Sequence, residues 1–276
     1  MRNTIILGTG RSGTSMVTAC FRNTGAYFGD QLIQSTPANP FGYYESQIIN
    51  DLNNRLVFRL LYPRGTFRLR RFLYPRTHYD WRAFWAVLPY SERSVELRPR
   101  ERDLIDDLLA NRPFCFKDPR FSATLGTWKD YLPDDTRFLT VFRCPFRTVD
   151  SMLRDARESY RPSLEFRRNK LLRTWIRTYE RLLRWAETDE RFMVFDSELL
   201  LAGRGQNELE SFVESQLDFS QIDPQVRRSK GIAHMDGRLE ARATRLHQLL
   251  QNVCEEHLGR IHSETLLPSS HTRLIE

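Results

Sequence analysis

The residues best suited to chemistry lie near the N-terminus, in a glycine-rich stretch that reads GTGRSGTS over Gly8–Ser15. A short apolar run, Thr4–Leu7, precedes it and is typical of a buried parallel strand, and the residues after it have the spacing of a helix with one buried face. Backbone N–H groups of such a turn, together with the positive end of the helix, converge on an anion. The stretch therefore predicts a phosphate- or sulfate-binding loop. The alternative is a glycine turn that merely joins a strand to a helix.

The spacing of this loop almost matches the nucleotide-triphosphatase pattern GxxxxGK[ST], but Thr14 occupies the lysine position. In that pattern the lysine reaches the β- and γ-phosphates and the following hydroxyl ligates magnesium, so ordinary ATP hydrolysis is not expected here. Arg11 supplies a cation in the loop instead. The hydroxyls of Ser12, Thr14 and Ser15 offer further donors, and Gly13 permits close backbone approach.

A second segment with the chemistry of an anion site begins where the apolar run 138–142 ends. Arg143 falls at the end of this predicted strand, and Pro145 is a natural first-turn residue of a helix. Ser151 lies about two turns into that helix, so Arg143 and Ser151 could hold one phosphate together. The alternatives are a surface salt bridge for Arg143 and an ordinary mid-helix position for Ser151.

Together these two segments resemble sulfotransferases of bacterial type that use 3′-phosphoadenosine 5′-phosphosulfate (PAPS). RSGTS after the first strand looks like the 5′-phosphosulfate loop of that family, and an Arg followed eight positions later by Ser looks like its 3′-phosphate motif. The resemblance implies that the 5′ side of the donor is bound by Arg11, Ser12, Gly13, Thr14 and Ser15. It implies that Arg143 and Ser151 bind the 3′-phosphate, and that Arg11 lies beside the transferring group as a catalytic cation.

A third element of the family is a basic, glycine-containing loop near the C-terminus that also contacts the 3′-phosphate. The segment 227–231, RRSKG, loosely resembles it, which implies donor-binding roles for Arg228 and Lys230. The aromatic-rich remainder of the usual pattern is absent from the sequence. A solvated run of charge is the equal alternative.

Sulfuryl transfer needs an in-line acceptor oxygen, a base for its proton and positive charge on the bridging oxygen. Lys117 follows a predicted strand at 114–116, and the carboxyl ends of parallel strands meet at one edge of a sheet, where open α/β sheets bind ligands. Lys117 could therefore neutralise the bridging oxygen. Asp118 and Arg120, in the same KDPR segment, either approach the donor or organise the loop.

Glu45 is the preferred candidate for the base. It ends the segment NPFGYYE (39–45), which resembles the NPxGYxE segment of a bacterial-type sulfotransferase group whose glutamate looks like a catalytic base. A glutamate in the first turn of a helix is also favourable on dipole grounds alone, and this is the competing explanation. The six histidines fall outside these motifs, so a histidine base has less support.

The remaining elements place these motifs in one fold. Strands are predicted at 4–7, 26–28, 114–116, 138–142 and 192–195, and helices from about 14, at 45–61, 101–110, 122–131, 146–158, 164–188, 207–217 and 237–258. Alternating strands and helices imply a three-layer α/β sandwich of P-loop type, with a central parallel sheet of about five strands. Residues 1–276 are expected to form a single sulfotransferase domain, with 62–100 as a cap or lid insertion.

The composition of the chain narrows the range of functions that it can have. The 276 residues carry a formal charge of +7 at pH 7, and only four of the 42 basic residues are lysines, which reflects either genome composition or guanidiniums that bind oxyanions. Four scattered cysteines without a CxxC pair argue against a zinc or redox site, and a metal is not expected. Lacking a long apolar run, the chain is expected to be cytoplasmic without a membrane span.

Three functions remain on the sequence alone. The first is transfer of a sulfuryl group from PAPS to a hydroxyl or amine of a small-molecule or saccharide acceptor; the arginines and aromatics of 62–100 would suit an anionic or sugar acceptor. The second is a P-loop small-molecule kinase. The third is a non-catalytic nucleotide- or nucleic-acid-binding protein, since interleaved arginines and aromatics also occur on nucleic-acid surfaces, although a nucleic-acid partner is not expected here.

Overall fold

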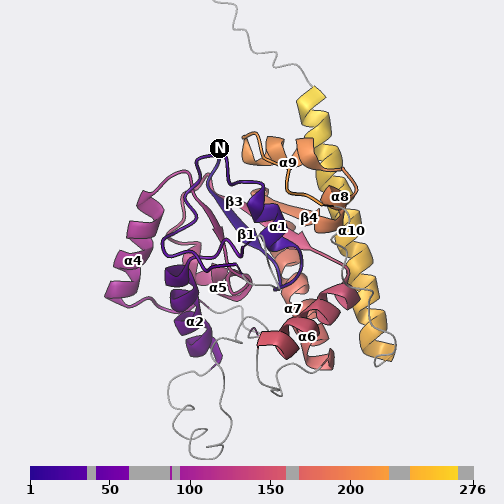
Figure 1. Ribbon diagram of the computed structural model, residues 1–276, viewed down its shortest axis with the longest axis horizontal. Helices are drawn as coiled ribbons and strands as arrows, with labels where there is room; N and C mark the ends of the chain where they lie inside the picture. Colours follow the sequence, from indigo (N-terminus) through magenta and orange to yellow (C-terminus); the bar gives the residue numbers. More distant parts are fainter. Residues whose placement is uncertain (36–41, 62–87, 89–93, 160–167, 224–236, 267–276) are drawn as a thin grey trace, which may run out of the picture.

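A parallel β-sheet lies at the centre of the computed structural model (Figure 1). The structure describes residues 1–35, 42–61, 88, 94–159, 168–223 and 237–266. Within these residues the strands are β1 (Thr4–Leu7), β2 (Cys115–Lys117), β3 (Arg137–Phe142) and β4 (Phe192–Asp196), in the order β2-β1-β3-β4. The predicted α/β class and parallel sheet are confirmed. The expected strand at 26–28 is reduced to a single bridge between Tyr27 and Phe114, on the free edge of β2.

The strands are buried on both faces, as their mostly apolar sequences require. All four residues of β1 are fully buried. Aromatic rings stack between and beside the strands: Phe114 lies 4.5 Å from Phe116, and Phe138 lies 4.6 Å from Phe192, measured between ring centroids. The core of the molecule therefore sits within the sheet and against its two faces.

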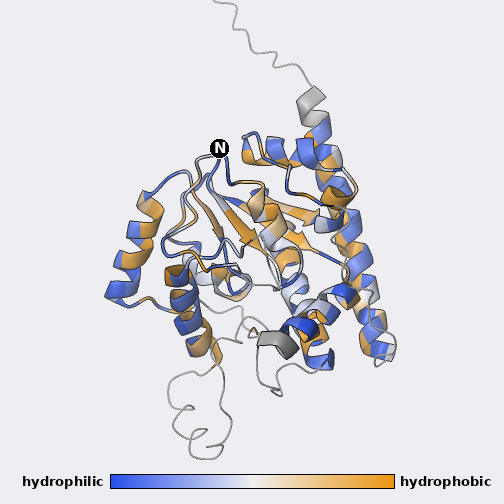
Figure 2. Cartoon of the chain, in the orientation of Figure 1, coloured by the Kyte–Doolittle hydropathy of each residue, from blue (hydrophilic) through white to orange (hydrophobic). Residues whose placement is uncertain are grey.

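Helices cover the sheet and turn their polar sides to solvent (Figure 2). They are α1 (Thr14–Ala19), α2 (Gln47–Leu61), α4 (Pro99–Ala110), α5 (Phe121–Trp128), α6 (Pro145–Ser159), α7 (Arg168–Ala186), α8 (Ser197–Leu201), α9 (Gln206–Val213) and α10 (Gly237–Leu266). The long α10 runs beside β4 and also contacts α7 (Figure 1). In the described part of the chain, no helix has the length and apolar character needed to cross a bilayer.

Most helix predictions are correct to within a few residues, and the differences have simple causes. Helix α8 is not anticipated because five residues are too short to show a helical period. Helix α10 continues beyond 258 to Leu266. Most of the expected insertion at 62–100 lies outside the described residues, and its last two residues already belong to α4.

Candidate active site

The glycine loop, residues 8–15, leaves β1 and enters α1 under tight steric constraint. Gly8 has a φ of 145°, and a Cβ added there would lie 2.4 Å from the carbonyl oxygen of Val141 on the neighbouring strand β3. Gly13 has a φ of 91°, and its Cβ would lie 2.5 Å from the side chain of Ser197. Both conformations suit glycine. The loop is thus pressed against β3 and the start of α8, and its backbone is kept free of side-chain bulk at these points.

Two buried side chains hold the loop from beneath. Ser122 accepts a hydrogen bond from the Gly8 N–H and donates one to the Gly8 carbonyl, both at 3.0 Å. The Tyr179 hydroxyl donates to the Val141 carbonyl at 2.8 Å and accepts from the Thr9 N–H at 3.3 Å. Burial raises the pKa of Tyr179, so the phenol stays protonated. Tyr179 is a buried packing residue that also fixes the loop.

The Ser12 hydroxyl does not face the open side of the loop, contrary to the expectation that it adds a donor there. It is buried, with the Thr9 carbonyl at 2.7 Å and the Val141 carbonyl at 3.2 Å as its acceptors, so it braces the loop from within. The backbone N–H groups of Thr14 and Ser15 belong to the first turn of α1. Such groups have no acceptor inside the helix and are the donors that a helix start offers to an anion.

The two motifs recognised in the sequence meet in space. Leu7 pairs with Thr140, so the parallel strands β1 and β3 end at the same edge of the sheet. Across that edge the Arg11 guanidinium donates from Nε to the Ser151 hydroxyl at 3.1 Å. Residues that lie 140 positions apart in the sequence thereby face one site.

A second cluster forms where β2 ends. The Lys117 ammonium group donates to a Glu45 carboxylate oxygen at 2.6 Å and to the Ser15 hydroxyl at 3.1 Å. Only 2% of the Lys117 side chain and 10% of the Glu45 side chain are exposed. The glycine loop, β2 and the segment before α2 thus contribute one residue each, and a cation and a carboxylate lie side by side at the loop.

Glu45 does not lie in the first turn of a helix, which corrects the expected helix start. Helix α2 begins at Gln47, and the Ser46 hydroxyl accepts from the Ile49 N–H in the manner of an N-cap. The Glu45 carbonyl instead accepts from the Ile33 N–H at 2.8 Å, in a short antiparallel contact beside the helix. The Glu45 side chain is therefore aimed at Lys117 by backbone that precedes the helix.

Behind Glu45 runs a chain of buried polar contacts. Asn50 donates to the second Glu45 oxygen at 3.3 Å, and Asn54 donates to the Asn50 amide oxygen at 3.0 Å. Arg120 donates to the Asn54 amide oxygen at 2.6 Å and pairs with Asp118 at 3.2 Å. Burial raises the pKa of the Asp118 carboxyl, although the Arg120 guanidinium works against that shift. This geometry agrees with an organising role for Asp118 and Arg120.

Arg143 lies at the end of β3, as expected, and its guanidinium is paired. Arg143 and Arg147 both donate to one oxygen of Glu198, at 3.3 Å and 2.7 Å. Burial would raise the pKa of Glu198, but the hydrogen bonds from Arg147 and Arg143 outweigh it, so the pKa lies below its ordinary value. The side chain of Asp196 caps α8 by accepting from the Glu198 N–H, and burial raises the pKa of Asp196 to about 6.

Other predicted site residues lie outside the described part of the chain. Arg228 and Lys230 fall in 224–236, and the start of the NPFGYYE segment falls in 36–41. Among the residues that are described, no group of His, Cys, Asp or Glu side chains has an arrangement that could hold a metal ion.

Several residues of the site were not anticipated, and each depends on a contact between distant segments. Ser122 reaches Gly8 from α5, and Glu198 reaches Arg143 from α8. Asn50 and Asn54 offered one local signal: two asparagines spaced four apart on the buried face of a helix need polar partners.

These features define a mixed α/β protein with a parallel sheet whose first strand leads into a glycine loop and a helix. Its fold is that of a sulfotransferase domain: the chain is similar to the solved structure of the sulfotransferase domain from the Synechococcus PCC 7002 olefin synthase. The similarity has a TM-score of 0.50 and 13% sequence identity, and covers 91% of this chain and 94% of that one. The sequence matches no family model and no curated protein.

Proposed function

We propose that this chain is a PAPS-dependent sulfotransferase that places a sulfuryl group on a hydroxyl or amine acceptor. The observation that carries the proposal is the convergence at one sheet edge. Arg11 contacts Ser151, and Ser15 of the same loop contacts Lys117, which contacts Glu45. Positive charge, backbone donors and a carboxylate are the groups that this reaction needs, and they come from four separate segments.

The glycine loop suits the 5′ side of the donor. The absence of a Cβ at Gly8 and Gly13 keeps the loop closely packed, and the first turn of α1 supplies N–H donors and a positive dipole. Arg11, Gly13, Thr14 and Ser15 line this side, while Ser12 shapes it from within. Arg143 and Ser151, with Arg228 and Lys230, are assigned to the 3′-phosphate.

The reaction is an in-line displacement at sulfur. The acceptor oxygen forms a bond to sulfur as the bond between sulfur and the bridging phosphate oxygen breaks, and the electron pair of that bond leaves on the phosphate. Glu45 takes the proton of the acceptor hydroxyl, and Lys117 and Arg11 stabilise negative charge on the transferring and leaving oxygens. The contact between Lys117 and Glu45 keeps the acid–base group and the cation within one hydrogen bond of each other.

Calorimetry with 3′-phosphoadenosine 5′-phosphate tests the donor assignment. The wild-type protein should bind this bisphosphate at least tenfold more tightly than AMP, in the presence of EDTA, because a charge-assisted phosphate contact contributes about 1.5–3 kcal/mol. Arg143→Ala should remove most of this preference and leave AMP binding unchanged. Equal affinity of the wild-type protein for the two nucleotides would refute the proposal.

Glu45→Gln tests the base. The variant should bind the bisphosphate like the wild-type protein, yet lose about a hundredfold or more in turnover with PAPS, because general base catalysis typically contributes that much. Single-turnover assays with the acceptor in excess measure the loss. A fully active Glu45→Gln enzyme would assign the proton transfer to another group.

A further inference from the structure

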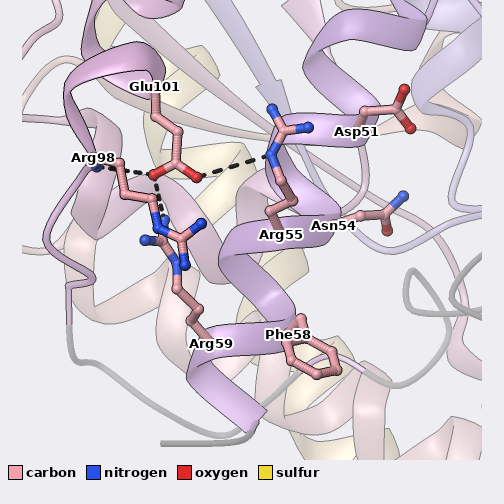
Figure 3. Close-up of a pocket in the computed structure, with 7 residues that line it drawn as sticks. All are labelled: Asp51, Asn54, Arg55, Phe58, Arg59, Arg98 and Glu101. Carbon is pink, nitrogen blue, oxygen red and sulfur yellow. Dashed lines mark hydrogen bonds and ion pairs between the residues drawn. The ribbon is translucent and has the colours of Figure 1, made fainter. Parts of the chain in front are cut away.

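A cavity of about 410 Å³ lies between α2 and the start of α4 (Figure 3). Its lining includes Asn54, Arg55, Phe58, Arg59, Arg98 and Glu101. Figure 3 shows that the side chains of Arg55 and Arg59 reach from α2 toward Glu101. The cavity thus combines guanidinium groups with one aromatic ring.

The cavity holds more cations than its carboxylates neutralise. Glu101 is buried, and its oxygens already serve Arg59 at 2.7 Å, Arg55 at 3.8 Å and the backbone N–H of Arg98 at 3.0 Å. The other acidic residue of the lining, Asp51, accepts from Gln47 at 3.0 Å. Three guanidiniums against two engaged carboxylates leave an excess of positive charge, which favours an anionic ligand.

The two guanidiniums that α2 contributes to the cavity differ in how accessible they are. The buried Nε of Arg59 has no hydrogen-bond partner, and a buried donor without a partner is costly. The Arg55 side chain is 52% exposed, and its ion pair with Glu101 is long. The exposed Arg55 guanidinium can therefore donate to an incoming oxyanion without breaking a short existing contact, whereas the Arg59 guanidinium is already held by Glu101 at 2.7 Å and adds positive charge beside it.

The cavity is tied to the active site by α2. Asn54 lines the cavity and also accepts from Arg120 in the polar chain that leads to Glu45. Arg55 follows Gln47, where α2 begins, by eight residues, a distance of about 12 Å at the rise of a helix. A molecule that reached both Glu45 and Arg55 would be elongated, with its reactive hydroxyl and its anionic group at opposite ends.

We propose that this cavity binds the anionic end of the acceptor, a carboxylate or a similar oxyanion carried on an apolar stem. The assignment rests on the proposed function, because it treats Glu45 as the position of the reacting hydroxyl. Arg55 holds the oxyanion, Arg59 adds positive charge beside it, and Phe58 contacts the stem. The acceptor class is thus an elongated hydroxy acid.

Calorimetry with ω-hydroxydodecanoate and its neutral carboxamide tests this inference on the full chain, with 3′-phosphoadenosine 5′-phosphate present to occupy the donor site. The wild-type protein should bind the carboxylate about tenfold more tightly than the carboxamide. Arg55→Gln should lose most of that preference. Arg102→Gln, which removes an exposed charge from α4 outside the cavity, is the matched control and should keep it.

The outcomes separate this inference from the proposed function. Equal affinity for the two probes in the wild-type protein, or an equal effect of the two glutamine variants, would overturn the assignment of the cavity. Inorganic phosphate that binds as tightly as the hydroxy acid, and loses affinity in Arg55→Gln, would show a site for free anions and would also overturn it. Failure to bind the bisphosphate would refute the donor assignment, while the comparison of Arg55→Gln with Arg102→Gln would still decide the cavity.

Discussion

Two ion pairs lie at the same edge of the sheet, and they differ in how far they are withdrawn from water. Lys117 and Glu45 have side chains that are 2% and 10% exposed, and Glu45 is held further by Asn50. Arg143 and Glu198 are 15% and 23% exposed, and Arg147 competes for the same Glu198 oxygen. The first pair is part of the folded interior, whereas the second can exchange one anion for another.

This difference has consequences for both stability and binding. Removing one partner of a buried pair leaves a charge that neither water nor protein compensates, while pairs nearer the surface contribute little on balance. The inner pair, Lys117 and Glu45, is therefore suited to the fixed geometry that the proposed transfer requires. The outer pair, Arg143 and Glu198, is suited to a ligand contact, because displacing Glu198 from Arg143 costs little free energy.

The largest expected effect is on stability. Lys117→Met should lower the free energy of unfolding by about 3–5 kcal/mol, because it leaves the Glu45 carboxylate buried and unpaired. Arg143→Met should lower it by only about 0–1 kcal/mol, because Glu198 keeps Arg147 and partial contact with water. Urea denaturation of the two variants measures the difference.

A rescue experiment strengthens this test. Adding Glu45→Gln to Lys117→Met removes the uncompensated charge, and most of the lost stability should return. Equal losses in Lys117→Met and Arg143→Met, or a double variant no more stable than Lys117→Met, would contradict the distinction between the two pairs.

A smaller effect concerns the acidic residue that caps α8 next to the outer pair. Asp196 has a pKa raised by burial from 3.8 to about 6, so the folded protein binds its proton more tightly than the unfolded chain. The stability that this proton confers is present below about pH 4 and is lost as the pH rises through about 6. Asp196→Asn keeps an acceptor for the Glu198 N–H without the charge, so its stability relative to the wild-type protein should rise by about 2–3 kcal/mol from pH 4 to pH 7.

Denaturation at several pH values measures this change. Asp130→Asn is the control, because it alters an acidic residue that is remote from α8 in the sequence. Ser197→Ala is not suitable as a control, because Ser197 packs against Gly13. A difference between Asp196→Asn and the wild-type protein that stays constant across this range, or that falls as the pH rises, would contradict the shift.

The fold could be predicted from the sequence because it rests on local patterns. Runs such as Thr4–Leu7 and 138–142 are mostly apolar, and a glycine or a proline within three residues of each run marks the turn at its end. The positions of Lys117 and Arg143 at strand ends, and of Arg11 in the loop that follows β1, are predictable from the same patterns, since parallel strands end at a common edge. The contacts of Arg11 with Ser151 and of Lys117 with Ser15 agree with that reasoning.

The sequence alone does not determine which partner each charged side chain has in the folded protein. For Arg143 it allows either a phosphate or a salt bridge, and the structure pairs this residue with Glu198, whose short helix has no visible period. Ser12 lies in the loop as expected, but its hydroxyl is buried against the carbonyls of Thr9 and Val141. Such choices depend on side-chain directions and burial, which spacing alone does not determine.

The smallest expected effect tests the exchangeable pair directly. If the 3′-phosphate of the donor must displace Glu198 from Arg143, then Glu198→Gln should remove a competitor and tighten binding of 3′-phosphoadenosine 5′-phosphate by about three- to tenfold. AMP lacks the 3′-phosphate, and its affinity should change much less. Calorimetry with both nucleotides measures the two effects.

Asp150→Asn is the control for this prediction, because it removes the same charge from α6, where Asp150 pairs with Arg154 and leaves Arg143 untouched. Its effect on bisphosphate affinity should be smaller than that of Glu198→Gln, because Asp150 pairs with Arg154 and does not compete for Arg143. Weaker bisphosphate binding by Glu198→Gln would mean that Glu198 positions Arg143 for the ligand. The outer pair would then have a fixed arrangement like that of the inner pair, and the two pairs would differ only in their exposure to water.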